Sequence, residues 1–283
     1  MNIPIHQIDA FTATPFKGNP AAVCFLNTPT TDAWMQSVAT EMNLSETAFL
    51  LQLPEDPKHD YQLRWFTPAA EVELCGHATL AAAHFLYQTD RHPASSPVRF
   101  KTLYSGTLIC SLAPDHTLHM NFPADTPQPA QASADLLTHL NLTPDDVLNV
   151  FKNNWDIILE LKSDALVRNL TPHFSNLIPF SDRGIAVTAA CTNPKDFHPN
   201  AKIDFVSRFF APKLRINEDP VTGSLHCVLA PYWSEKLNKT NLTAYQASPR
   251  GGLLNLSLDN TRLHIAGRAV TILQGSLLHP PAT

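Results

Sequence analysis

Glycine is scarce in this sequence, with 9 residues among 283, and cysteine is scarcer, with 5. No two cysteines form a CxxC pair and their number is odd, so the chain lacks the pattern of a disulfide framework or a zinc finger. Long apolar runs are missing too, because stretches such as 21–26 are far too short to span a membrane. These absences favour a protein with free thiols in a reducing compartment.

An excess of basic residues is also missing. The sequence has 20 Lys+Arg against 25 Asp+Glu, a formal net charge of −5, which disfavours a nucleic-acid-binding protein. The first thirty residues carry Asp9 and Lys17 and no long apolar run, so they do not resemble a signal peptide. Because 44% of the residues are hydrophobic and 16% are charged, the chain can form packed cores. We expect a cytoplasmic globular protein of about two domains that binds neither nucleic acid nor membrane.

The sequence contains a weak internal repeat with an offset of about 145 residues. Residues 64–68 (RWFTP) match 208–212 (RFFAP), and each match is followed by a glycine and an apolar segment, at Gly76 and at Gly223. The match continues from 105–109 to 251–254 and from 118–120 to 263–265. The alternative is chance similarity between two hairpins. We interpret the pattern as two similar halves, an N-terminal one over 1–125 and a C-terminal one over 126–283.

Periodicity and turn residues predict a similar set of elements in each half. Asp32 is the expected N-cap of the first helix and Thr143 that of the last. We expect helices over 31–42, 76–87, 134–140 and 144–150, and strands over 5–11, 21–26, 47–53, 63–66, 108–112, 118–122, 157–161 and 185–190. This set of elements indicates an α+β fold.

Gly76 and Gly223 stand at the same place in the two halves, directly before an apolar helix. The start of a helix has unpaired backbone N–H groups and a partial positive charge, which favour an anion. If the halves face one another, two such helix starts would hold a small anionic substrate. In the alternative interpretation, each glycine only permits a turn or tight packing.

Three polar residues are candidates for chemistry, and two of them, His77 and Asp219, stand near these glycines. His77 could donate a hydrogen bond or move a proton, although it is one of 13 histidines and could be structural. Asp219 could orient His77 or bind a substrate amine, or could simply be the turn residue before Pro220. Glu46 would serve as a general base if it is partly buried, since burial raises a carboxyl pKa, but it could instead be an exposed residue at a strand end.

Other common catalytic signatures are absent from the sequence. It contains no GxGxxG or Walker A motif, no HExxH, and no GxSxG. The signals for dinucleotide binding, P-loop nucleotide binding, zinc proteolysis and serine hydrolysis are therefore missing.

Five ordered segments resemble the PhzF (phenazine-biosynthesis-like) family: 9–11, 17–23, 43–49, 75–81 and 218–224. The resemblance implies a diaminopimelate-epimerase-like fold, in which each half has a sheet or open barrel around a central helix and the active site lies between the halves. It implies that Glu46 is the catalytic glutamate, which moves a proton between substrate carbons. It implies no metal and no organic cofactor, and it makes a homodimer plausible. The residues implied to bind substrate are Gly76, His77, Asp219, Gly223 and Ser224.

The related epimerases use two facing cysteines, and this sequence departs from that pattern. Cys75 occupies the first position and Thr222 the second. A threonine hydroxyl is too weak an acid to replace a thiol, whose pKa is about 8.5. Cys75 then is a small packing residue or a reactive thiol at a helix start. Arg250 could bind a carboxylate or be a solvated turn residue.

The resemblance and the candidate residues together predict an isomerase that needs no cofactor. Its substrate is expected to be small, to carry a carboxylate, and to be cyclic or similar to an amino acid. Two alternatives stay open: a non-catalytic protein that binds a small molecule or another protein, and an epimerase that uses Cys75 with Glu46 as the opposing base.

Overall fold

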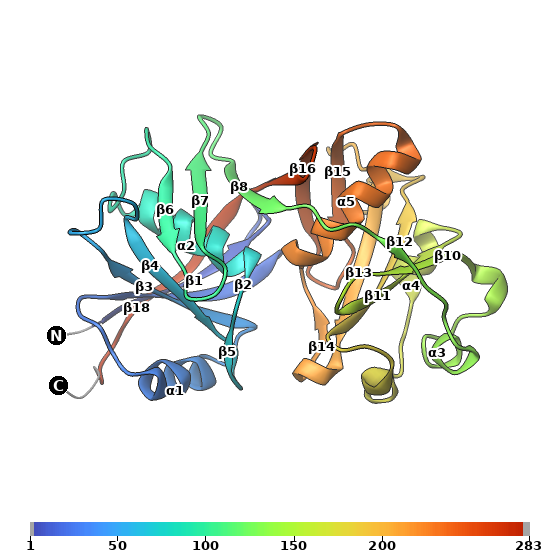
Figure 1. Ribbon diagram of the computed structural model, residues 1–283, viewed down its shortest axis with the longest axis horizontal. Helices are drawn as coiled ribbons and strands as arrows, with labels where there is room; N and C mark the ends of the chain where they lie inside the picture. Colours follow the sequence, from blue (N-terminus) through green and yellow to red (C-terminus); the bar gives the residue numbers. More distant parts are fainter. Residues whose placement is uncertain (1–2, 280–283) are drawn as a thin grey trace. The chain divides into compact units, whose positions relative to one another are not determined.

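The first and last strands of the computed structural model pair with each other, so both belong to one unit. The structure describes residues 3–279. The chain forms two compact units, one of residues 3–122 and 264–279 and the other of residues 123–263 (Figure 1). Among the helices of the described residues, none combines the length and the apolarity needed to span a bilayer.

In the first unit a mixed sheet packs around helix α2 (Gly76–Gln88) (Figure 1). The small side chains of Ala78 and 81–83 are fully buried, which lets the strands approach the helix closely. Helix α1 (Asp32–Met42) covers β3 and β4. The strands are β1 (Ile3–Ala10), β2 (Asn19–Leu26), β3 (Glu46–Gln52), β4 (Tyr61–Phe66), β5 (Glu71–Val72), β6 (Val98–Lys101), β7 (Thr107–Leu112), β8 (Leu118–Pro123) and β18 (Ala269–Leu277).

In the second unit the long helix is α5 (Gly223–Leu237), which packs on β15 and β16. The other helices are α3 (Ala134–His139), α4 (Asp164–Asn169) and the 3₁₀ segments η1 (Pro144–Asp146), η2 (Phe174–Phe180), η3 (Pro194–Asp196) and η4 (Pro212–Leu214). The strands are β9 (Gln128–Pro129), β10 (Val147–Lys152), β11 (Asp156–Leu161), β12 (Gly184–Ala190), β13 (Phe205–Ala211), β14 (Ile216–Asp219), β15 (Asn241–Gln246) and β16 (Gly252–Asp259), and β17 (Arg262–Gly267) runs from this unit into the first.

The two units have the same order of strand pairings. In the first unit β1–β2 is antiparallel, β2–β3 parallel, β3–β4 and β4–β5 antiparallel, β4–β6 parallel and β6–β7 antiparallel. The second unit repeats this order in the pairs β10–β11, β11–β12, β12–β13, β13–β14, β13–β15 and β15–β16. The internal repeat in the sequence therefore corresponds to two similar mixed α/β units.

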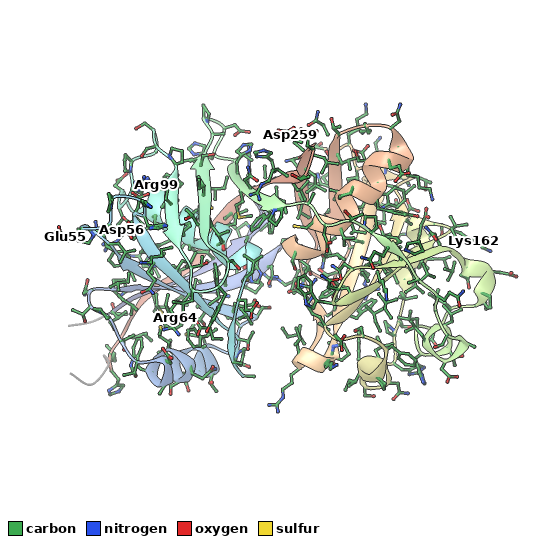
Figure 2. All side chains as sticks on the ribbon, in the orientation of Figure 1. Glu55, Asp56, Arg64, Arg99, Lys162 and Asp259 are labelled. Carbon is green, nitrogen blue, oxygen red and sulfur yellow. The ribbon has the colours of Figure 1, made fainter. Side chains whose placement is uncertain are left out.

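A buried arginine–glutamate pair is repeated with the strands. Arg208 of β13 donates from Nε and Nη2 to Glu218 of β14, at 2.7 and 2.8 Å. Arg64 of β4, labelled in Figure 2, donates in the same way to Glu71 of β5, at 2.7 Å for both bonds. Each glutamate stands five residues before the glycine that begins the long helix. The pair therefore ties the short strand that leads into that helix to the rest of the sheet.

The structure differs from the sequence-based expectations in three places. Residues 264–279, which the repeat assigned to the C-terminal half, belong to the first unit because β18 pairs along β1. Residues 144–150 form a 3₁₀ turn followed by strand β10, since pairing with β11 outweighs the helical tendency of this segment. The N-cap of α1 is Thr31, whose hydroxyl accepts from the backbone of Trp34, whereas Asp32 accepts from Arg64.

Candidate active site

The candidate base and its neighbours lie where two elements of the first unit begin. Glu46 is the first residue of β3 and pairs in register with Ala21 of β2. Cys75 is the N-cap of α2, with an extended backbone, and His77 is the second residue of that helix. The side chain of His77 is 5% exposed and that of Glu46 is 14% exposed. The carboxylate is therefore largely removed from water but keeps a path to it.

His77 lies between an acidic group and a thiol. Its Nε2 atom is 3.2 Å from Oε2 of Glu46, a hydrogen-bonding distance without the alignment of a hydrogen bond. Its Nδ1 atom is 3.4 Å from Sγ of Cys75. Burial lowers the pKa of His77 to about 3, so the ring is neutral near neutral pH. A neutral imidazole has one N–H donor and one acceptor nitrogen, so it can donate to only one of these two neighbours at a time.

The second unit gathers its candidate residues at the start of α5. Asp219 ends β14, Thr222 is the N-cap, and Gly223 is the first helical residue. The amide of Gln246, which is fully buried, holds this connection: its Nε2 donates to the backbone carbonyl of Asp219 at 2.7 Å, and its Oε1 accepts from the backbone N–H of Thr222 at 2.8 Å. The hydroxyl of Thr222 donates to the Asp219 carboxylate. This turn is therefore pre-organised by its own hydrogen bonds.

Ser224, the next residue of α5, has a partner that sequence reasoning missed. Arg183 donates from Nη1 to Oγ of Ser224 at 2.9 Å and from Nε to Oδ1 of Asp156 at 2.8 Å, and its Nη2 also contacts Asp156. Asp156 is 1% exposed, so the arginine neutralises a buried carboxylate while it contacts the serine. Because Oγ accepts from the guanidinium, the serine keeps its own O–H for another acceptor. No sequence motif joins these three residues, since they stand on separate elements.

The structure thus brings the candidate residues together in two groups. Glu46 and His77 are in contact in the first unit, and Gly76 begins the same helix. Asp219 and Gly223 belong to one turn of the second unit, and Ser224 follows it. The expectation that Asp219 orients His77 stays a prediction, as does the expectation that both helix starts hold one ligand. Cys75 is buried, as expected of a packing residue, but its contact with His77 gives the thiol a chemical neighbour.

Comparison with known proteins gives a consistent assignment. The family model described as phenazine biosynthesis-like protein matches residues 8–275. An uncharacterised isomerase of Halalkalibacterium halodurans is 47% identical over 280 residues, which cover 98% of this chain and 99% of that protein. The crystal structure of a PhzF-family phenazine biosynthesis protein of Enterococcus faecalis has a TM-score of 0.87 at 38% identity, over 99% of this chain and 100% of that chain.

A more distant likeness concerns the fold alone. A probable proline racemase of Agrobacterium radiobacter has a TM-score of 0.64 at 10% identity, over 98% of this chain and 94% of that chain. Together with the PhzF-family structure, it confirms the expected α+β fold of the epimerase type with two similar halves.

Proposed function

The chain belongs to the phenazine biosynthesis-like family of isomerases, and we propose that it moves a carbon-bound proton on a small carboxylate-bearing substrate without a cofactor. The substrate class, cyclic or similar to an amino acid, follows from the family resemblance. Glu46 is the proposed general base and acid.

The proposed reaction balances without any other reactant. The Glu46 carboxylate takes a proton from a substrate carbon, and the electron pair of the broken C–H bond is delocalised toward a neighbouring double bond or carboxylate. The Glu46 carboxyl then returns the proton to a carbon of the same molecule, so that the product is an isomer. Such acid–base catalysis contributes about 10²–10⁴-fold to the rate. Backbone N–H groups at the helix starts of Gly76 and Gly223 would stabilise the negative charge that develops.

The observation that carries the proposal is the position of the Glu46 carboxylate. It is 14% exposed, it begins a strand beside the start of α2, and it lies 3.2 Å from the buried imidazole of His77. A base in this setting is protected from bulk water and held in a limited range of orientations, while a substrate can still reach it. His77 is proposed to orient this carboxylate and to bind substrate.

Asp219 and Ser224 are proposed to bind the substrate from the second unit. The carboxylate of Asp219 accepts from Thr222 and has the charge to bind a substrate amine. The hydroxyl of Ser224, whose oxygen accepts from Arg183, can donate its proton to a substrate carboxylate. The two residues would therefore select a substrate that carries both groups.

The test is an exchange screen with the full chain in D₂O over a panel of amino acids and cyclic carboxylates, followed by proton NMR. We expect at least one compound to lose a C–H signal and to yield a deuterated isomer. Glu46→Gln should slow this reaction by at least about 100-fold and leave binding of that compound largely intact. Glu41→Gln, which removes the same charge from an exposed position of α1, should react at the unaltered rate.

Two results would contradict the proposal. Turnover by Glu46→Gln at the full rate would exclude Glu46 as the base. Binding of a panel compound by the unaltered chain with no exchange of any C–H would favour the non-catalytic binding protein instead.

The contact between Cys75 and His77 favours a second candidate, an epimerase in which the thiol and Glu46 act on opposite faces of one carbon. The distance of 3.4 Å from Sγ to Nδ1 is short enough for proton exchange between the two groups. Cys75→Ala separates the candidates, because it should abolish epimerisation but leave a proton shift by Glu46 in place.

A further inference from the structure

The carboxylate at the start of β3 has a counterpart of opposite charge in the second unit. Glu46 is the first residue of β3 and contacts His77, the second residue of α2. The equivalent strand of the second unit is β12, and Arg183 directly precedes it. Arg183 contacts Ser224, the second residue of α5, at 2.9 Å. The duplicated scaffold therefore has a guanidinium in one unit at the place where the other unit has the proposed base.

We propose that Arg183 binds the carboxylate of the substrate together with Ser224, so that the second unit selects ligands by their negative charge. This inference rests on the proposed function, because it assigns the charged group that recognises the proposed substrate.

The guanidinium of Arg183 has donors left for a ligand. An arginine side chain has five N–H donors in one plane. Nε and Nη2 bond to Asp156, and Nη1 bonds to Ser224. These bonds use three donors, so within residues 3–279 two N–H groups stay available. The arginine side chain is 24% exposed, which lets a ligand reach them. Together with the O–H of Ser224, they suit the two oxygens of a carboxylate.

Arg183 keeps its charge although it is partly buried. Burial disfavours the charged form, but the hydrogen bonds to Asp156 and the nearby charge of Asp219 raise the pKa of the arginine above its ordinary value. The side chain of Asp156 is fully buried. A ligand that approaches from the solvent therefore meets the guanidinium and not the carboxylate behind it.

Two aromatic rings fix the position of the guanidinium. The rings of Trp155 and Phe209 each have their centre 5.5 Å from the central carbon of the guanidinium, a distance at which a cation is attracted to a ring face. Phe209 is 3% exposed, whereas Trp155 is 54% exposed. The indole of Trp155 therefore borders the solvent beside Arg183, so its fluorescence reports a ligand that binds there.

The test uses benzoate and benzamide, two probes that have the same ring and differ in charge. Their binding to the full chain is measured by calorimetry and by tryptophan fluorescence. We expect benzoate to change the fluorescence saturably. Benzamide should bind at least about 10-fold more weakly, since a hydrogen bond between charged groups contributes about 10–100-fold to affinity.

The informative variant replaces both members of the buried pair. Arg183→Gln combined with Asp156→Asn removes one charge of each sign, so it leaves no carboxylate buried without its partner. It should weaken benzoate binding at least about 10-fold and leave benzamide binding within about threefold. If Arg183 serves folding alone, the variant should change the binding of both probes by the same factor. Arg215→Gln removes a positive charge from an exposed position of the same unit and should bind both probes like the unaltered chain.

A substitution of the indole shows where benzoate binds. Trp155→Phe should abolish the fluorescence change, while the affinity measured by calorimetry stays within about fivefold because an aromatic ring is kept. The inference is overturned if the unaltered chain does not bind benzoate, if Trp155→Phe keeps the fluorescence change, or if the double variant weakens both probes equally.

The reaction gives a further measurement. For a compound that exchanges its C–H in the screen, kcat/KM should fall at least about 10-fold in the double variant. An unchanged kcat/KM would count against Arg183 as a binding residue. The binding measurements involve no turnover and so test Arg183 separately from Glu46. Charge-selective binding of benzoate by a chain that exchanges no C–H would count against the proposed reaction and leave the role of Arg183 in place.

Discussion

The repeated arginine–glutamate pair allows the two units to be compared by one substitution. In the second unit, Arg208 is 8% exposed and its partner Glu218 is 11% exposed. In the first unit, Arg64 and Glu71 are 13% and 19% exposed, and Arg64 also has Asp32 as a partner at 2.7 Å. Removal of the glutamate charge therefore takes from Arg208 the carboxylate that accepts its Nε and Nη2 hydrogen bonds, whereas Arg64 keeps the carboxylate of Asp32.

Glu218→Gln should consequently cost more stability than Glu71→Gln. Removing one partner of a buried ion pair costs about 3–5 kcal/mol, because the other charge stays desolvated. The glutamine oxygen can still accept one hydrogen bond from Arg208, so we expect about 3 kcal/mol for Glu218→Gln. For Glu71→Gln we expect about 1 kcal/mol, since the neighbouring aspartate still neutralises the guanidinium.

Native-state hydrogen exchange gives the local unfolding free energy of each unit separately. Amides of β13 should lose protection in Glu218→Gln, and amides of β4 should lose less in Glu71→Gln. Glu235→Gln, an exposed position of α5, is the control for the change of charge and should stay within about 0.5 kcal/mol. An equal loss in the two pair variants, or a loss below about 1 kcal/mol for Glu218→Gln, would refute the assignment of Arg208 as a desolvated charge.

Other perturbations test the pH response, the backbone and the serine's partner. Burial lowers the pKa of His226 to about 4, so the unfolded chain binds a proton at this histidine at higher pH than the folded chain does. The free energy of unfolding therefore falls as the pH drops from 6.5 toward 4. Urea unfolding at pH 7.5 and 5.5 should show that His226→Gln removes about 1 kcal/mol of this decrease in stability. A Cβ on Gly18 (φ +64°) would lie 2.1 Å from a backbone oxygen, whereas a Cβ on Gly106 (φ +67°) would meet open space. Gly18→Ala should therefore lower the melting temperature clearly more than Gly106→Ala. Equal decreases in the two variants would contradict the steric argument. Arg183→Met takes the arginine away from the buried carboxylate of Asp156 and should lower the free energy of unfolding in urea by about 3 kcal/mol or more. Arg183→Lys should recover only part of this stability, because lysine cannot form the bidentate contact that arginine forms with both carboxylate oxygens.

The fold was accessible from the sequence because its duplication is visible in short matching segments. The matching segments 64–68 and 208–212 include the ends of β4 and β13. After each of them the chain reaches a glycine that begins a long helix, Gly76 in α2 and Gly223 in α5. The errors have local causes. Residues 144–150 carry a cap signal, but the strand partner at 156–161 decides their conformation. The return of 264–279 to the first unit depends on pairing with the distant β1, which no local pattern reports.

Only those residues of the candidate site that belong to a sequence motif could be predicted, and the contacts between them could not. Glu46 and His77 belong to separate motifs, and their contact became visible only in the structure. The burial that lowers the pKa of His77 depends on the strands packed around α2, not on its neighbours in sequence. Arg183 could not be found, because its contacts with Asp156 and Ser224 join elements far apart in the chain.

Duplication followed by divergence explains how the two helix starts differ in chemistry. In both units an arginine–glutamate pair holds the short strand that leads into the helix, so the backbone at Gly76 and Gly223 is supported in the same way. The residue before each glycine differs. The thiol of Cys75 contacts an imidazole, whereas the hydroxyl of Thr222 donates to a carboxylate. A thiol and an imidazole can exchange protons, but a threonine hydroxyl is too weak an acid to do so. Proton transfer is therefore expected in the first unit and not at the start of α5.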